Sequence, residues 1–184
     1  MAAPQRILLD ACVLFPTVMR EVLLAVARRG LFAPLWSARI LEEWARAASK
    51  IGPLGPVQAR TEIALLRAHW PAAEVAQVPE EQMRRLWLPD ANDVHVLAAA
   101  VAGHADAILT VNTKDFPKHI LAEEGLDRLS PDPFLYGLWL EAPDAVSAAC
   151  AEVLEQARKI DGAPVEMRAL LKRARLPRLA KAVG

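Results

Sequence analysis

Short runs of consecutive apolar residues alternate, through about residue 130, with longer segments in which apolar residues recur at helical spacing. The first run, residues 6–10, is continuous, so we predict a parallel strand that is buried on both faces. Residues 17–29 follow a helical period, and Gly30 suits the position just after a helix. Residues 31–36 form a second short apolar run, which predicts a strand although it contains Pro34.

The next segment continues this alternation less regularly. Ser37 suits the N-cap position of a helix, because its hydroxyl can accept a hydrogen bond from a free N–H of the first turn. The predicted elements here are a helix over 38–50, a Gly- and Pro-rich break over 51–56, and a helix over 57–70. Residues 72–87 are ambiguous, with an edge strand over 75–78 and a helical turn or two over 79–87 as the interpretation.

Residues 88–117 combine a predicted helix and a predicted strand with acidic residues at both edges. Asp90 suits an N-cap, apolar residues then recur at helical spacing, and Gly103 stands where the helix would stop. Residues 107–111 have the length and β-branched content of a strand. Asp93 therefore falls in the first turn of a helix, and Asp115 falls just past the carboxyl end of a strand, where open α/β sheets bind ligands.

Beyond residue 132 the pattern is helical only, after a short predicted helix over 118–124. The predicted helices 133–141, 143–159 and 164–174 each begin with Pro at a first-turn position, and 176–183 adds a last turn or two. We therefore predict an α/β domain over residues 1–131, with a central parallel sheet flanked by helices on both faces, and a C-terminal helical extension over 132–184.

Composition excludes several classes of protein. The chain has 184 residues, 54% of them hydrophobic, but no apolar run approaches the roughly 20 residues of a membrane span. The N-terminus does not resemble a signal peptide, so we expect a cytoplasmic protein without a membrane partner. Cys12 and Cys150 are too few and too far apart to indicate a disulfide framework or a zinc site.

The net charge is zero, but it is unevenly distributed. Residues 1–157 hold 14 Lys and Arg against 20 Asp and Glu, whereas residues 158–184 hold 8 against 2. The basic tail could face a polyanion, or it could be a solvated helical face that offsets the acidic body.

Four acidic positions fall where a parallel sheet would gather them at one edge. They are Asp10 after the first strand, Glu43 (or Glu42) in the following helix, Asp93 and Asp115. One Asp at a helix start is often only a cap, but four acids at one edge would repel each other. A hard divalent cation removes this repulsion, and oxygen-only ligands suit Mg²⁺ or Mn²⁺. The pattern indicates phosphoryl-transfer chemistry with water as the nucleophile.

The order and spacing of these motifs resemble the PIN-domain family and, within it, the VapC-type toxins of bacterial toxin–antitoxin pairs. The matching segments are 7–14 (ILLDACVL), 35–43 (LWSARILEE), 88–100 (LPDANDVHVLAAA) and 105–117 (ADAILTVNTKDFP). The resemblance spans about residues 5–130, and segments 142–146 and 176–179 also resemble the C-terminal extension of one VapC subgroup.

The resemblance implies a metal-dependent endoribonuclease that hydrolyses RNA phosphodiester bonds with metal-activated water. Asp10, Glu43, Asp93 and Asp115 match the acids that bind Mg²⁺ or Mn²⁺, with Glu42 as the alternative to Glu43. Many PIN domains have Asp where this chain has Asn112, and VapC-type members often have Asn there together with an Asp before Phe, as at Asp115. The resemblance also implies a cognate antitoxin and a homodimer.

Other residues near these acids have a functional and a structural interpretation. Thr110 would support the site by hydrogen bonding, and Asn112 would orient a metal-bound water. His95 is either a phosphate contact or proton shuttle, or a structural histidine. Cys12 is interpreted as a small buried residue and not as a nucleophile.

Surface contacts with RNA or with a second copy are also open. Lys114 and Lys118 either meet RNA or are solvated, and Trp44 or Trp87 either stack bases or are buried. The stripe Met19, Val22, Leu23 and Val26 is either core or a dimer face.

Three other functions compete with the nuclease. The main alternative is a catalytically silent PIN-fold binding or regulatory module, which Asn112 alone suggests. A haloacid-dehalogenase-like phosphatase would need Asp at position 12, which is Cys12. A dinucleotide-binding protein is disfavoured because no Gly-x-Gly-x-x-Gly follows the first strand.

Overall fold

The computed structural model describes residues 3–162 and 164–184. The chain forms two compact units. The sheet unit comprises residues 5–15 and 33–128, and the helical unit comprises the described residues of 3–4, 16–32 and 129–184. The predicted division at residues 131 and 132 is not tested by this grouping and stays a prediction.

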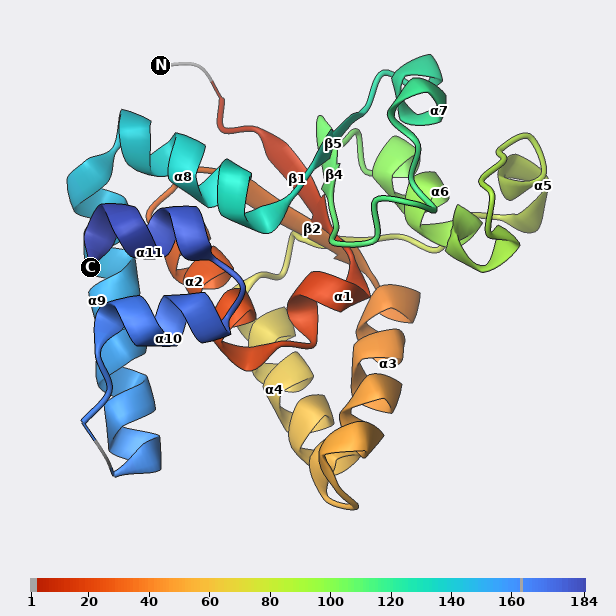
Figure 1. The fold of residues 1–184 in the computed structure, drawn as a ribbon. Helices are drawn as coiled ribbons and strands as arrows, with labels where there is room; N and C mark the ends of the chain where they lie inside the picture. The colour runs from red at the N-terminus through yellow and green to blue at the C-terminus, as the bar shows by residue number, and fades with distance from the viewer. Residues whose placement is uncertain (1–2, 163) are drawn as a thin grey trace. The chain divides into compact units, whose positions relative to one another are not determined.

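The predicted α/β fold is confirmed, because the described residues contain a five-stranded parallel sheet flanked by helices. The strands are β1 (Arg6–Leu9), β2 (Ala33–Ser37), β3 (Glu74–Val75), β4 (Ala107–Leu109) and β5 (Asp127–Leu129), in the spatial order β3-β2-β1-β4-β5. Figure 1 labels β1, β2, β4 and β5. β1 pairs with β2 on one side and with β4 on the other. The direction of winding therefore reverses between β1 and β4, and their carboxyl ends form the switch point at which such sheets bind ligands.

Burial explains why β1 occupies this central position. Ile7, Leu8 and Leu9 are fully buried, and so are the facing residues Ile108 and Leu109 of β4. A strand that is covered on both faces is continuously apolar, as the sequence predicted for β1. β3 lies at the sheet edge and has only two half-buried residues, which limits the unpaired backbone that it exposes.

The sheet unit contains six described α-helices and two 3₁₀ turns. They are α1 (Ala11–Leu14), α3 (Ala38–Ala47), η1 (Ala48–Ile51), α4 (Gly55–His69), α5 (Glu80–Met83), η2 (Ala91–Asp93), α6 (Val94–Ala102) and α7 (Lys118–Glu123). Ser37 caps α3 as predicted, since its Oγ accepts a hydrogen bond of 3.2 Å from the N–H of Ile40. Asp90 caps η2, because its side chain accepts from the N–H of Asn92 at 2.9 Å.

The strands differ from the prediction in two respects. β5 was not predicted, because Asp-Arg-Leu is short and its first two residues are charged. β2 and β3 are shifted slightly from the predicted strands. Gly103 ends α6 as predicted, although its φ of −79° is not left-handed; the left-handed residue is His104, with a φ of 49°. Gly103 is needed for packing instead, because a Cβ there would lie 2.7 Å from Cγ2 of Val75.

The helical unit contains α2 (Thr17–Arg28), α8 (Pro131–Glu141), α9 (Pro143–Asp161), α10 (Met167–Arg173) and α11 (Pro177–Val183). The Glu152 carboxylate joins α9 to the end of α2, with ion pairs to Arg28 at 2.7 Å and Arg29 at 3.1 Å. Asp132 caps α11 by accepting from the N–H groups of Arg178 and Leu179 at 3.0 Å each.

The predicted helical extension is therefore present, although its third helix begins at Met167 and not at Pro164. The stripe Met19, Val22, Leu23 and Val26 is buried, which favours its interpretation as core. A membrane-spanning helix is not found in the described part of the chain, since none of its helices combines sufficient length with sufficient apolarity.

Candidate active site

The acids predicted from the sequence lie around the switch point of the sheet. Asp10 directly follows β1, and Asp115 lies in the turn that follows β4. Asp90 and Asp93 belong to the turn that leads into α6. Three segments that are distant in the sequence thus contribute acids to one region, because parallel strands with right-handed crossovers place strand ends and helix starts at the same edge.

Asp10 is held by two side-chain donors. It is only 7% exposed, and its Oδ2 accepts a hydrogen bond from Oγ1 of Thr110 at 2.8 Å and from Sγ of Cys12 at 3.1 Å. The N–H of Asn112 in turn donates to Oγ1 of Thr110 at 3.0 Å. Burial, with a smaller effect from the Asp10 charge, raises the pKa of the Cys12 thiol to about 12. Cys12 is half-buried, and its thiol is therefore a protonated hydrogen-bond donor to Asp10, which favours its interpretation as a structural residue.

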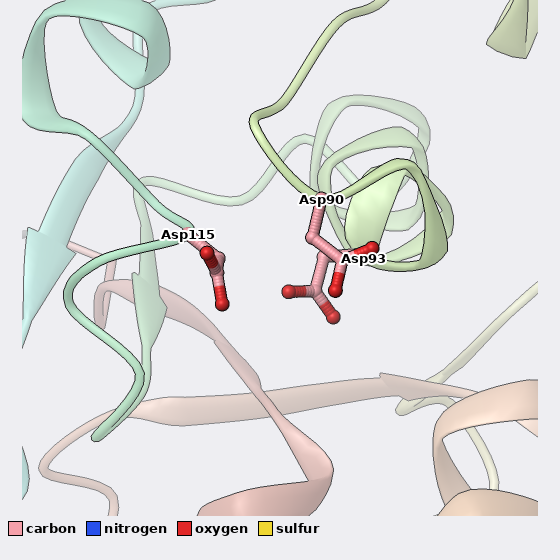
Figure 2. A group of neighbouring side chains, drawn as sticks. All are labelled: Asp90, Asp93 and Asp115. Carbon is pink, nitrogen blue, oxygen red and sulfur yellow. The ribbon is translucent and has the colours of Figure 1, made fainter.

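Three carboxylates face one another beside Asp10. One oxygen from each of Asp90, Asp93 and Asp115 lies within 4.8 Å of the other two (Figure 2). The Asp115 turn is fixed by Arg128 of β5, whose Nη1 donates to the carbonyl oxygens of Thr113 at 2.8 Å and Phe116 at 3.0 Å.

Repulsion within this cluster is reflected in the pKa of Asp93. Desolvation is the main cause that raises its pKa from 3.8 to about 6, followed by the charges of Asp10, Asp90 and Asp115, while His95 acts in the opposite direction. The side-chain amide of Asn112 donates to Oδ2 of Asp93 at 3.2 Å. Clustered oxygen donors with a raised pKa fit a hard divalent cation such as Mg²⁺ or Mn²⁺, which would relieve the repulsion.

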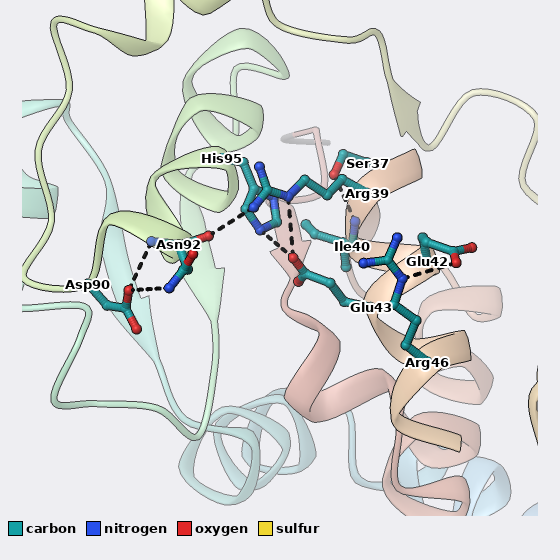
Figure 3. A network of polar contacts seen from close by, with 9 residues as sticks. All are labelled: Ser37, Arg39, Ile40, Glu42, Glu43, Arg46, Asp90, Asn92 and His95. Atoms are coloured by element: carbon teal, nitrogen blue, oxygen red, sulfur yellow. Dashed lines mark hydrogen bonds and ion pairs between the residues drawn. The ribbon is translucent and has the colours of Figure 1, made fainter. Parts of the chain in front are cut away.

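The structure distinguishes Glu43 from Glu42. Oε1 of Glu43 lies 2.8 Å from Nε2 of His95 and 3.4 Å from Nε of Arg39, so Glu43 faces α6 (Figure 3). Glu42 instead binds Arg60 at 2.7 Å and Arg46 at 3.2 Å. The hydrogen bond from Arg60 is the main cause that lowers the pKa of Glu42 to about 2.

Glu43 is thus the acid on the side of α6, although it lies outside the group formed by Asp90, Asp93 and Asp115. The assignment of Asp10, Glu43, Asp93 and Asp115 as catalytic metal ligands stays a prediction.

Two residues near the site were not predicted to act there. Asp90 was interpreted only as a helix cap, and Arg128 was not considered. The signal for Asp90 was its spacing, because residues 90 and 93 lie one turn apart and can point in the same direction. Arg128 carried no such signal, since its partners are backbone carbonyls that only the fold brings close.

The flanking residues are also placed by the structure. Trp44 is buried, which excludes it from base stacking, whereas Trp87 is 65% exposed. Lys114 and Lys118 are exposed.

The hydrogen bond between Thr110 and Asp10 should contribute measurably to stability. We expect Thr110→Val to lower the free energy of unfolding by about 1–3 kcal/mol, because it leaves a buried carboxylate oxygen with one donor fewer. Thr110→Ser keeps the hydroxyl, so its free energy of unfolding should fall much less. Urea denaturation measures the free energy of unfolding of both variants. An unchanged value in Thr110→Val, which keeps the γ-methyl group and the shape of the side chain, would show that the hydrogen bond does not contribute to stability.

The fold and the acids define an α/β protein with a candidate divalent-cation site at the sheet switch point. Residues 6–114 match the family model of the PIN domain, and because this match covers more than half of the chain, the protein belongs to the PIN-domain family. PIN domains are typically metal-dependent nucleases. Comparison with curated proteins and with solved structures found no match.

Proposed function

We propose that this protein is a metal-dependent endoribonuclease that hydrolyses RNA phosphodiester bonds with water as the nucleophile. The observation that carries the proposal is the group of Asp90, Asp93 and Asp115, with carboxylate oxygens within 4.8 Å of one another in a PIN domain. Asp10 adds a fourth negative charge, which acts on Asp93. No side-chain nucleophile is required, and the protonated thiol of Cys12 does not offer one.

The residues of the chain have distinct tasks in this proposal. Asp93 and Asp115, with Asp10 and Asp90, would hold Mg²⁺ or Mn²⁺. When bound, such an ion lowers the pKa of water and stabilises negative charge on the phosphate oxygens. Thr110 and Cys12 fix the orientation of Asp10, and Asn112 fixes that of Asp93. Asn112 therefore takes a hydrogen-bonding role in place of the charge that many PIN domains have at this position.

Substrate binding would use positive charge close to the acids. Lys114 and Lys118 are exposed and flank Asp115 in the chain. Lysine side chains at these positions suit the phosphates of an RNA backbone, so binding should weaken as the salt concentration rises.

We further propose that the nuclease is the toxin of a type II toxin–antitoxin pair. Support comes from the order and spacing of the motifs in segments 7–14, 35–43, 88–100 and 105–117, which resemble those of VapC-type toxins. The proposal includes a cognate antitoxin that covers the acidic site, and a homodimer.

A matched pair of variants tests both proposals. We expect the wild-type protein to cleave a mixed RNA pool with Mg²⁺ or Mn²⁺ and not with EDTA. Glu43→Gln should lower this activity by about 10–100-fold, because Glu43 holds His95 next to the acids. Glu42→Gln should leave it nearly unchanged, because Glu42 binds Arg60 and Arg46 instead. Gel analysis of the RNA products measures the cleavage.

Growth of a bacterial host tests the toxin role with the same variants. Induced wild-type protein and Glu42→Gln should arrest growth, whereas Glu43→Gln should do so much less. RNA cleavage without growth arrest would contradict the toxin role and leave the nuclease intact. No cleavage with either metal would favour the silent binding module.

A further inference from the structure

A pocket of about 580 Å³ lies in the sheet unit beside the edge strand β3. Its apolar lining includes Ala38, Val75, Val78, Met83 and Ala99. Its volume is within the range of pockets that bind small organic molecules, and apolar walls with a few polar groups are typical of them. The acids Asp90, Asp93 and Asp115 do not line this pocket, so it is a separate feature of the molecule.

His95 gives the pocket a polar end. Its side chain is only 6% exposed and lines the pocket. Nε2 lies 2.8 Å from Oε1 of Glu43, whereas Nδ1 has no hydrogen-bond partner among the described residues. The contact with Glu43 is an ion pair when the imidazole is protonated, and a hydrogen bond from Nε2–H when it is neutral. Buried polar groups in folded proteins nearly always have a hydrogen-bond partner, so an imidazole nitrogen without a partner at a pocket wall indicates a ligand with polar atoms.

The polar end of the pocket is connected to the acidic site. Arg39 lines the pocket, and its guanidinium lies 3.4 Å from Oε1 of Glu43 and donates to the carbonyl oxygen of Asn92 at 3.5 Å (Figure 3). The side-chain amide of Asn92 in turn donates to Oδ1 of Asp90 at 3.0 Å. A ligand that enters the pocket would therefore sit next to whatever binds at the acids.

We propose that this pocket binds one nucleobase of the RNA substrate and thereby selects the cleavage position. A nucleobase has flat apolar faces, which suit the walls formed by Val75, Val78 and Met83, and a polar edge, which could donate to or accept from His95. Arg39 at the same pocket is placed to contact the attached phosphate. A purely apolar ligand would leave Nδ1 of His95 without a partner. This inference rests on the proposed nuclease function for the identity of its ligand.

Filling the pocket from its rim tests the proposal without changing the acids. Ala76 lines the pocket and is exposed, so Ala76→Trp should fold normally and occupy the space of the base. Ala64→Trp is the matched control, because Ala64 is an exposed residue of α4 outside the pocket. Circular dichroism verifies the fold of both variants.

The first readout is nucleoside binding in EDTA. Adenosine, guanosine, cytidine and uridine are each titrated into the wild-type protein and both variants, and the NMR resonances of the His95 ring are followed. We expect a saturable shift with at least one nucleoside in the wild-type protein and in Ala64→Trp, and none in Ala76→Trp. The absence of a shift with all four nucleosides, or equal shifts in the two variants, would overturn the proposal.

The second readout is cleavage of an RNA pool with randomised sequence in Mg²⁺ or Mn²⁺. In Ala76→Trp we expect the base preference at one position to disappear and KM to rise about tenfold, which corresponds to about 1.4 kcal/mol of lost binding free energy. An unchanged preference and KM would contradict the base pocket. If the wild-type protein cleaves no RNA, the nuclease proposal fails, and nucleoside binding in EDTA still decides whether the pocket binds a base.

Discussion

Replacing Asp93 with asparagine should abolish metal-dependent RNA cleavage while it makes the metal-free protein more stable. Asp93 is the acid on which the cluster acts most clearly, because burial and three neighbouring carboxylates raise its pKa to about 6. Asparagine keeps the shape of the side chain and can still accept the hydrogen bond from Asn112, but it removes the charge. Activity and stability should therefore change in opposite directions.

The sign of the stability effect follows from the direction in which the pKa of Asp93 is shifted. The folded-state pKa of Asp93 lies above its ordinary value of 3.8, so the folded protein holds this proton more tightly than the unfolded chain does. The bound proton of Asp93 contributes fully to the free energy of unfolding below about pH 4, and this contribution is lost as the pH rises to about 6. At pH 7 the ionised group opposes folding. Because the side chain is partly solvated, we expect Asp93→Asn to gain only about 1 kcal/mol.

The size of the activity loss follows from the position of Asp93 in the cluster. Changes of residues that only support metal ligands lower activity or metal affinity by about 10–100-fold, so a ligand should cost at least about 100-fold. RNA cleavage and thermal unfolding in EDTA measure the two effects.

Asp127→Asn is the matched control for this variant, because Asp127 is an exposed residue of β5 outside the acid cluster. Asp127→Asn should change neither the rate of RNA cleavage nor the thermal stability in EDTA. Loss of activity together with loss of stability in Asp93→Asn would instead indicate that Asp93 is structural.

Binding of Mg²⁺ or Mn²⁺ should weaken about tenfold for each pH unit below about 6. Metal ions bind the ionised carboxylate, so below its pKa of about 6 the Asp93 proton must leave when the ion enters. Above that pH, Asp93 is ionised in the free protein and the affinity should become nearly constant. Isothermal titration calorimetry between pH 5 and 8, in buffers of different ionisation enthalpy, measures both the affinity and the released proton.

The Asp93→Asn variant provides the control for the titration. It should bind metal more weakly, and its affinity should lack the change near pH 6. An affinity of the wild-type protein that does not vary between pH 5 and 6 would show that Asp93 does not bind the ion. Proton release that persists in Asp93→Asn would assign the proton to another acid of the cluster.

Local sequence patterns predicted most elements of the fold, because their signals lie within a few residues. The continuous apolar run of β1 requires burial on both faces, and Ser37 offers a hydroxyl at the position where α3 needs an N-cap. The same local patterns placed Asp10, Asp93 and Asp115 at strand ends or a helix start. The parallel alternation then implied that these acids share one edge of the sheet, which the structure confirms for Asp93 and Asp115.

Tertiary structure decided what depends on partners far away in the chain. Asp90 joins the acid group because η2 and the Asp115 turn are brought together, and Glu43 faces α6 because His95 lies there while Arg60 binds Glu42. Position 103 requires glycine because a Cβ there would clash with the side chain of Val75, which lies 28 residues earlier in the sequence. The sequence by itself determined which elements form and where the acids stand along them, since backbone preferences and burial periods are local. Which carboxylates meet depended on packing between segments, and no local pattern specifies that.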